Sequence, residues 1–192
     1  MAEVLLFHHA LGLTAGVETF ADRLRSAGHR VTTPDLYDGA SFRTVEEGVA
    51  HAEAVGFDAI LAAGTGAAGE SRAGVVYAGL SLGALVAHML AQTRPGAAGA
   101  LLYHHGDVPV ATFAPSWPSG VDLQIHVNEH DPWCELDIVE EFVAVAGAHA
   151  QAELFVYPGS THLFLDSGLD DFDPGSASLA LERTLAFLNR IG

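Results

Sequence analysis

The chain alternates short apolar runs with longer segments whose apolar residues recur every three or four positions. The short runs are typical of strands buried on both faces of a sheet. They cover residues 3–9, 29–37 (ending near Pro34), 73–79, 98–105, 121–127 and 152–159. The longer segments predict helices over residues 16–28, 44–56, 84–94, 135–149 and 174–191. Thr44 and Glu47 in capping-box spacing, and Asp173 before Pro174, mark two of the helix starts.

Strands that alternate with helices pair in parallel through right-handed crossovers. The pattern therefore predicts an α/β fold, a doubly wound and mostly parallel sheet of about six strands with helices on both faces. The 192 residues, of which 49% are hydrophobic, are enough for one sizeable core, so we expect a single domain over residues 1–192. In such sheets ligands bind at the carboxyl ends of the strands.

The charge balance narrows the choice of partners. The chain has 24 acidic and 8 basic residues, a formal charge of −16, which disfavours nucleic acid and anionic membrane surfaces. Its single cysteine, Cys134, allows no internal disulfide and fits a reducing compartment. The N-terminal residues have no basic region before a signal core, and no segment approaches the ~20 apolar residues of a membrane span. We therefore expect a cytoplasmic protein.

One serine stands where a predicted strand becomes a predicted helix. Gly79-Leu80-Ser81-Leu82-Gly83 matches the Gly-x-Ser-x-Gly nucleophile elbow, which requires this strand–turn–helix setting. The turn exposes the serine at the helix N-terminus, where free N–H groups suit a developing oxyanion. A glycine-rich turn with a capping serine is the structural alternative.

A serine nucleophile needs a histidine base that is oriented by a carboxylate. In α/β-hydrolases the acid and then the histidine follow the serine along the chain. Asp131 comes after the strand at 121–127, and His162 comes after the strand at 152–159. Glu129 is a rival acid. Asp131 could instead form an Asx turn before Pro132, and His162 could be an ordinary loop histidine.

These residues together resemble the dienelactone hydrolase family of α/β-hydrolases. The resemblance rests on "TPDLY", "GLSLG", Asp131, "YPGSTHLF" and "LALERTLAFL", and it covers nearly the whole chain. It implies a minimal α/β-hydrolase fold with Ser81 as nucleophile, His162 as general base and Asp131 as the orienting acid. It also implies an oxyanion hole built from the backbone N–H groups of Leu82 and Ala10, and no cofactor.

The sequence departs from the family pattern at three positions of the implied site. Ser81 replaces the usual cysteine, His9 replaces a glutamate, and Asp166 replaces an arginine that helps to bind the substrate carboxylate. The segment between "PDLY" and the elbow is also shorter. These departures argue against dienelactone as substrate and favour neutral short-chain esters or lactones.

Two histidine pairs, His8–His9 and His104–His105, end the first and fourth predicted strands. Imidazoles can ligate zinc or copper, but adjacent strand residues point to opposite sides, and the chain has no HExxH motif. We therefore expect no metal, and place His9 and His105, together with Leu11, in the wall of a substrate pocket. The imidazoles of His9 and His105 would gain positive charge only as the pH falls toward ~6.5.

The sequence thus predicts a serine hydrolase that cleaves a carboxylic ester or lactone through an acyl-enzyme on Ser81. Its partner would be a small-molecule substrate, without cofactor, metal, nucleic acid or membrane. Two alternatives stay open. One is a hydrolase-fold protein that binds a small molecule without turnover, and the other is a histidine-rich metal-binding protein.

Overall fold

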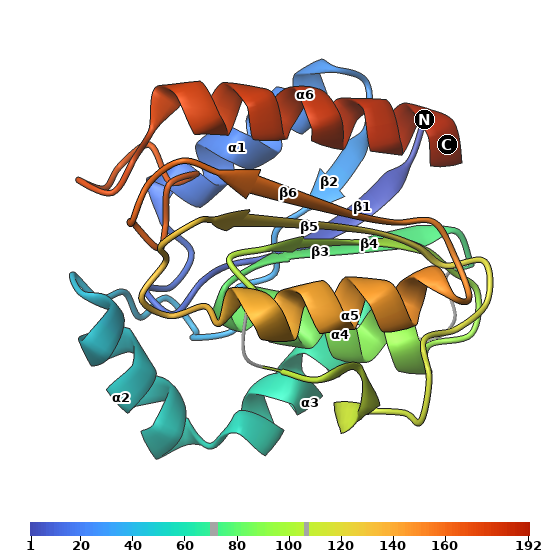
Figure 1. Cartoon of the computed structure of the whole chain (residues 1–192). Helices are drawn as coiled ribbons and strands as arrows, with labels where there is room; N and C mark the ends of the chain where they lie inside the picture. The colour runs from blue at the N-terminus through green and yellow to red at the C-terminus, as the bar shows by residue number, and fades with distance from the viewer. Residues whose placement is uncertain (70–72, 106–107) are drawn as a thin grey trace.

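The computed structural model describes residues 1–69, 73–105 and 108–192. All strands pair in parallel in one six-stranded sheet of order β2-β1-β3-β4-β5-β6 (Figure 1). The strands are β1 (Glu3–Phe7), β2 (Arg30–Thr32), β3 (Val75–Leu80), β4 (Ala97–Tyr103), β5 (Asp122–Asn128) and β6 (Ala152–Tyr157). The predicted doubly wound parallel sheet is confirmed.

Helices cover both faces of the sheet (Figure 1). They are α1 (Ala15–Ser26), α2 (Val45–Val55), α3 (Phe57–Ala68), α4 (Leu82–Thr93), α5 (Leu136–Gly147) and α6 (Pro174–Ile191), with a short 3-10 helix at Val110–Thr112. Helices α1 and α6 lie on one face, and α4 and α5 on the other, while α2 and α3 extend beyond that second face. No helix of the described residues is long and apolar enough to cross a membrane.

Each face of the sheet has its own apolar core. One core contains Val17 and Phe20 of α1 and Phe187 of α6, and the other contains Val86 of α4 and Phe142 of α5. Strand β3, between β1 and β4, is buried at every position. A strand covered on both faces must be apolar throughout, which explains the continuous runs in the sequence.

Two elements differ from the sequence-based expectation. Helix α3 was not predicted, because Gly64 and Gly66 weaken its helix propensity and Gly56 provides no side-chain cap. Strand β2 is only Arg30–Thr32, because the chain turns after Pro34, where the Asp35 carboxylate accepts the backbone N–H groups of Tyr37 and Gly39. Strand β2 is therefore shorter than the strand that was predicted over residues 29–37.

The strand order places the candidate site. From β1 the chain first adds β2 on one side and then crosses back to add β3 on the other. Crevices form at the carboxyl ends of the strands where this direction reverses, and they are the usual ligand sites of doubly wound sheets. The segments that follow β1 and β3 contain Ala10 and Ser81, which meet at this point.

Candidate active site

Ser81 lies in a strained turn between β3 and α4. Its φ of 52° is in the left-handed region, which costs a non-glycine residue about 1–3 kcal/mol. The turn needs both flanking glycines, because a Cβ on Gly79 would lie 2.0 Å from the Gly83 carbonyl oxygen, and a Cβ on Gly83 would lie 2.3 Å from that of Phe7. The Ser81 N–H donates to the Tyr103 carbonyl of β4 at 2.8 Å. The serine is therefore held at a fixed place above the sheet.

The structure brings Ser81, His162 and Asp131 together in one hydrogen-bonded chain. The Ser81 Oγ lies 2.7 Å from His162 Nε2, and His162 Nδ1 lies 2.9 and 2.8 Å from the two carboxylate oxygens of Asp131. Because a carboxylate only accepts, Nδ1 carries the proton and Nε2 is free to accept the serine hydroxyl. His162 and Asp131 are both buried, which keeps competing water away from this contact.

The rival acid does not reach the histidine. Glu129 is exposed, and its backbone N–H donates to Tyr157 in β6. Asp131 also forms the alternative Asx turn, because its Oδ1 accepts the backbone N–H of Trp133 at 2.9 Å. The turn and the histidine contact therefore coexist, and the turn holds the carboxylate in place.

Two backbone N–H groups near Ser81 have no hydrogen-bond acceptor among the described residues. Leu82 is the first residue of α4, so its N–H has no partner within the helix. Ala10 follows β1, and its N–H makes no hydrogen bond within the described parts of the chain. Ala10, Ser81 and Leu82 line the same cavity of about 230 Å³, whose lining is mainly apolar.

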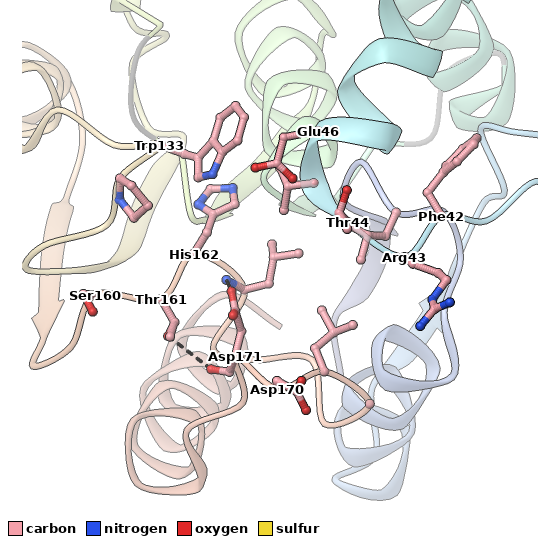
Figure 2. A pocket seen from close by; sticks show the side chains of 16 residues that line it. Phe42, Arg43, Thr44, Glu46, Trp133, Ser160, Thr161, His162, Asp170 and Asp171 are labelled. Carbon is pink, nitrogen blue, oxygen red and sulfur yellow. Dashed lines mark hydrogen bonds between the residues drawn. The ribbon is translucent and has the colours of Figure 1, made fainter.

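A larger cavity of about 670 Å³ adjoins the first, and Figure 2 shows the residues that line it. His162, Val45 and Trp133 line both cavities. Its charged lining residues are Arg43, Glu46, Asp170 and Asp171. The carboxylates outnumber the guanidinium, so this cavity is more negative than positive. The histidine thus stands between a small apolar space and a wider polar one.

The predicted pocket residues have different positions. His105 lines the smaller cavity and Leu11 the larger one. His9 lines neither, and the expectation that it forms the pocket wall is wrong. Its side chain is fully buried, because Nε2 bonds Asp166 Oδ2 at 2.8 Å and holds the ring beneath the site.

Burial sets the charge of the nearby imidazoles. Desolvation lowers the pKa of His105 to about 4 and the pKa of His104 well below its ordinary value of 6.5. The imidazole of His105 therefore stays neutral at pH 6.5, contrary to the expectation that it could supply positive charge there.

His104 and His105 follow β4 in a bend, where His104 has a φ of 57°, and their rings lie in different clusters. The ring of His104 contacts His162 and Phe164, whereas that of His105 contacts His88 and Phe142. In the described ranges no three His, Cys, Asp or Glu side chains form a group that could hold a metal ion. The pairs are therefore parts of separate packed clusters.

Sequence reasoning missed the residues that α2 and its preceding loop bring to the site. Arg43 lines the larger cavity, and Val45, Val49 and Ala52 line the smaller one. The three apolar residues share one helix face, which their spacing could have indicated. Only the tertiary structure shows that this face covers Ser81.

Comparisons with known proteins identify the family and the fold of the chain. The family model of the dienelactone hydrolase family matches residues 1–192. No curated protein matches the sequence. Solved structures share the fold, among them a candidate dienelactone hydrolase from Klebsiella pneumoniae subsp. pneumoniae with a TM-score of 0.79 and 20% identity, covering 99% of this chain and 87% of that one.

Two further solved structures have lower identity. A dienelactone hydrolase-like promiscuous phosphotriesterase from metagenomic libraries has a TM-score of 0.71 and 15% identity, covering 100% of this chain and 87% of that one. Esterase 2 of Thermogutta terrifontis, phosphonylated by cyclosarin, also has a TM-score of 0.71 and 15% identity, covering 100% and 83%. At such identities these structures support the fold alone, but the family model covers every residue. The chain therefore belongs to the dienelactone hydrolase family, within the α/β-hydrolases.

Proposed function

We propose that this protein is a serine hydrolase that cleaves neutral short-chain carboxylic esters or lactones through an acyl-enzyme on Ser81. Membership of a hydrolase family supports hydrolysis in general. The observation that carries the finer proposal is the hydrogen-bonded chain from Ser81 through His162 to Asp131 at the edge of a cavity.

In the first step Ser81 Oγ attacks the substrate carbonyl carbon while His162 Nε2 takes the hydroxyl proton. Asp131 holds the imidazole in the required tautomer and stabilises the imidazolium that forms. The carbonyl oxygen becomes an oxyanion and accepts hydrogen bonds from the Leu82 and Ala10 N–H groups. The C–O bond to the alcohol then breaks, and His162 returns the proton to the leaving oxygen.

In the second step water replaces the alcohol. His162 removes a proton from the water as its oxygen attacks the acyl carbon, and the same two N–H groups hold the second oxyanion. Breaking the Ser81 ester bond then releases the acid and restores the serine hydroxyl. Every proton moves through His162 Nε2, so these steps need no cofactor.

The two cavities favour uncharged substrates of modest size. The smaller one holds Ser81 and has room for a short acyl group between Val49, Leu82 and Leu85. The larger one lies on the His162 side, where the leaving alcohol is protonated. Its excess of carboxylates over Arg43 opposes an anionic substrate.

A fluorophosphonate probe with peptide mapping tests the nucleophile. We expect the label on Ser81, and we expect Ser81→Ala to lose both labelling and nearly all p-nitrophenyl acetate hydrolysis while circular dichroism stays unchanged. Ser178→Ala, on the exposed side of α6, is the matched control and should behave like the wild type. A label on another serine, or full activity in Ser81→Ala, contradicts the proposal. If the wild type shows neither labelling nor turnover, the alternative of a binding protein is favoured instead.

A further inference from the structure

A second Asp–His pair lies beneath the site and takes part in no step above. His9 Nε2 is 2.8 Å from Asp166 Oδ2, and both side chains are fully buried. His9 directly precedes Ala10, and Asp166 belongs to the segment that follows His162. The pair therefore ties the loop that carries an oxyanion donor to the loop that carries the base.

Hydrogen bonds at both nitrogens fix the ring of His9. The backbone N–H of Leu11 donates to Nδ1 at 3.3 Å, so Nδ1 is unprotonated and Nε2 carries the hydrogen that Asp166 accepts. The N–H of Gly12 donates to the His9 carbonyl at 3.1 Å, which closes the turn. Ala10 therefore lies between His9 and Leu11, which the imidazole of His9 connects.

The surroundings of Asp166 fit a carboxylate. The Thr14 hydroxyl at the N-cap of α1 donates to its Oδ2, and the Gly168 N–H donates to its Oδ1 at 2.8 Å. Gly16 in the first turn of α1 leaves room, because a Cβ there would lie 1.5 Å from Oδ1. A buried carboxylate is costly unless such donors satisfy it. These donors anchor the carboxylate and, through it, His9.

We propose that Asp166 and His9 are positioning residues that hold the Ala10 N–H in the oxyanion hole relative to His162. This inference rests on the serine-hydrolase function proposed above. Asp166 fixes the His9 ring at Nε2, and the ring fixes the Leu11 N–H at Nδ1. Without Asp166 the ring is free to turn, the turn around Ala10 loosens, and one oxyanion donor loses its alignment.

The test compares Asp166→Ala with a buried substitution at the other end of the strands, where β5 begins. Trp117→Phe is the matched control, because it removes the bond from Trp117 Nε1 to the Val121 carbonyl (2.7 Å), just before β5. For each protein we would measure kcat and KM on p-nitrophenyl acetate, the Ki of a trifluoromethyl ketone, and amide hydrogen exchange at Leu11. The ketone forms an oxyanion adduct with the serine and therefore reports on the hole.

Asp166→Ala should lower kcat by about 10- to 100-fold with little change in KM, the effect of a displacement of about 1 Å at a reacting centre. The Ki should rise by the same factor as kcat/KM falls, and exchange at Leu11 should become faster. Asp166→Asn should recover most of the activity, because its Oδ1 can still accept the His9 Nε2–H. Trp117→Phe should lose stability and keep kcat.

An Asp166→Ala protein that loses stability but keeps kcat, Ki and Leu11 exchange, as Trp117→Phe does, would overturn the proposal. If Asp166→Ala does not fold, His9→Phe takes its place, because a phenyl ring fills similar space but neither donates to Asp166 nor accepts the Leu11 N–H, while Thr14 and Gly168 still donate to the carboxylate. Unchanged kcat and Leu11 exchange in that variant would equally overturn it. Absence of Ser81-dependent turnover in the wild type would instead contradict the proposed function, and Leu11 exchange would still decide whether the pair orders the loop.

Discussion

The molecule contains two buried Asp–His pairs with the same 2.8 Å contact, Asp131 with His162 and Asp166 with His9. They differ in the atom that meets the other imidazole nitrogen. For His162 this atom is the hydroxyl oxygen of Ser81 at the edge of a cavity, and for His9 it is the buried backbone N–H of Leu11. In the proposed function the first pair moves the proton of Ser81, whereas both imidazole nitrogens of the second pair are occupied by groups within the protein.

The comparison shows that residue types alone do not define a catalytic pair. Both histidines follow strands at the same edge of the sheet, and each is oriented by an aspartate from another loop. In one pair the carboxylate binds Nδ1 and leaves Nε2 to the serine, and in the other it binds Nε2. The two pairs differ in which imidazole nitrogen the carboxylate leaves unbound. They also differ in whether that nitrogen faces a cavity that a substrate can enter.

The largest expected effect comes from breaking the first pair. Asp131→Asn should lower kcat by about 10⁴-fold, because an amide no longer enforces the tautomer in which Nε2 accepts the serine proton. Thermal unfolding should change little, since the asparagine keeps the turn to Trp133. Steady-state kinetics and a melting curve measure the two effects.

Glu129→Gln is the matched control for this variant, because it removes a carboxylate two residues away that does not contact His162. It should retain wild-type kcat. A crippled Glu129→Gln protein beside an active Asp131→Asn protein would mean that the acid is Glu129.

We expect the pair of Asp166 and His9 to make the free energy of unfolding depend on pH. Burial alone raises the pKa of Asp166, but bonds from His9, Thr14 and Gly168 outweigh it and leave the pKa below its ordinary value of 3.8. A lowered folded-state pKa stabilises the protein above the unfolded-state pKa, and this contribution is lost as the pH falls through the folded value. Asp166→Asn should therefore cost about 2 kcal/mol of unfolding free energy at pH 7, and less at pH 3.

Urea unfolding of both proteins at pH 7 and pH 3 measures this difference. The other carboxylates titrate equally in both chains and cancel. A gap that stays constant between the two pH values would show that ionisation of Asp166 adds no stability.

The smallest expected effect concerns substrate charge and follows from what both pairs lack. Neither pair presents a free positive charge to a cavity, and Arg43 is outnumbered there by Glu46, Asp170 and Asp171. At pH 8 a neutral short-chain ester should exceed a carboxylate-bearing ester of equal size in kcat/KM by about tenfold, or about 1.4 kcal/mol. The gap should narrow as salt is added.

Paired assays of the two esters at low and high ionic strength test this expectation, with Arg43→Gln as the sharpening variant. Removing the guanidinium should widen the preference for the neutral ester. A wild-type preference for the anion would mean that Arg43 dominates the cavity despite its acidic neighbours.

The sheet was predictable because its strands are covered on both faces and must be apolar, as β3 is at every position. Helix α3 was not predictable, because tertiary packing against α4 overrides the weak propensity of a segment that contains Gly64 and Gly66. The apolar run around β2 overstated that strand, because hydrophobicity alone does not locate the turn at Asp35.

The candidate catalytic residues were predictable because strand ends converge at one edge of a parallel sheet. Ser81, Asp131 and His162 each follow a strand, and their order along the chain matched a known arrangement. The contribution of Arg43 was not predictable, since it depends on how α2 folds over the site. The bond between His9 and Asp166 was also hidden, because a histidine beside a strand end gives no indication of which face it will turn to.

The bond between His9 and Asp166 joins residues 157 positions apart, whereas His162 and Asp131 are 31 apart. Closing so long a chain loop before other contacts form is entropically unfavourable, so distant contacts are made late in folding. We therefore expect the contact between His162 and Asp131 to form before the one between His9 and Asp166. Under the proposed function, a refolding chain would complete its oxyanion hole only when these two distant segments have met, so esterase activity should return later than the circular dichroism signal of the sheet.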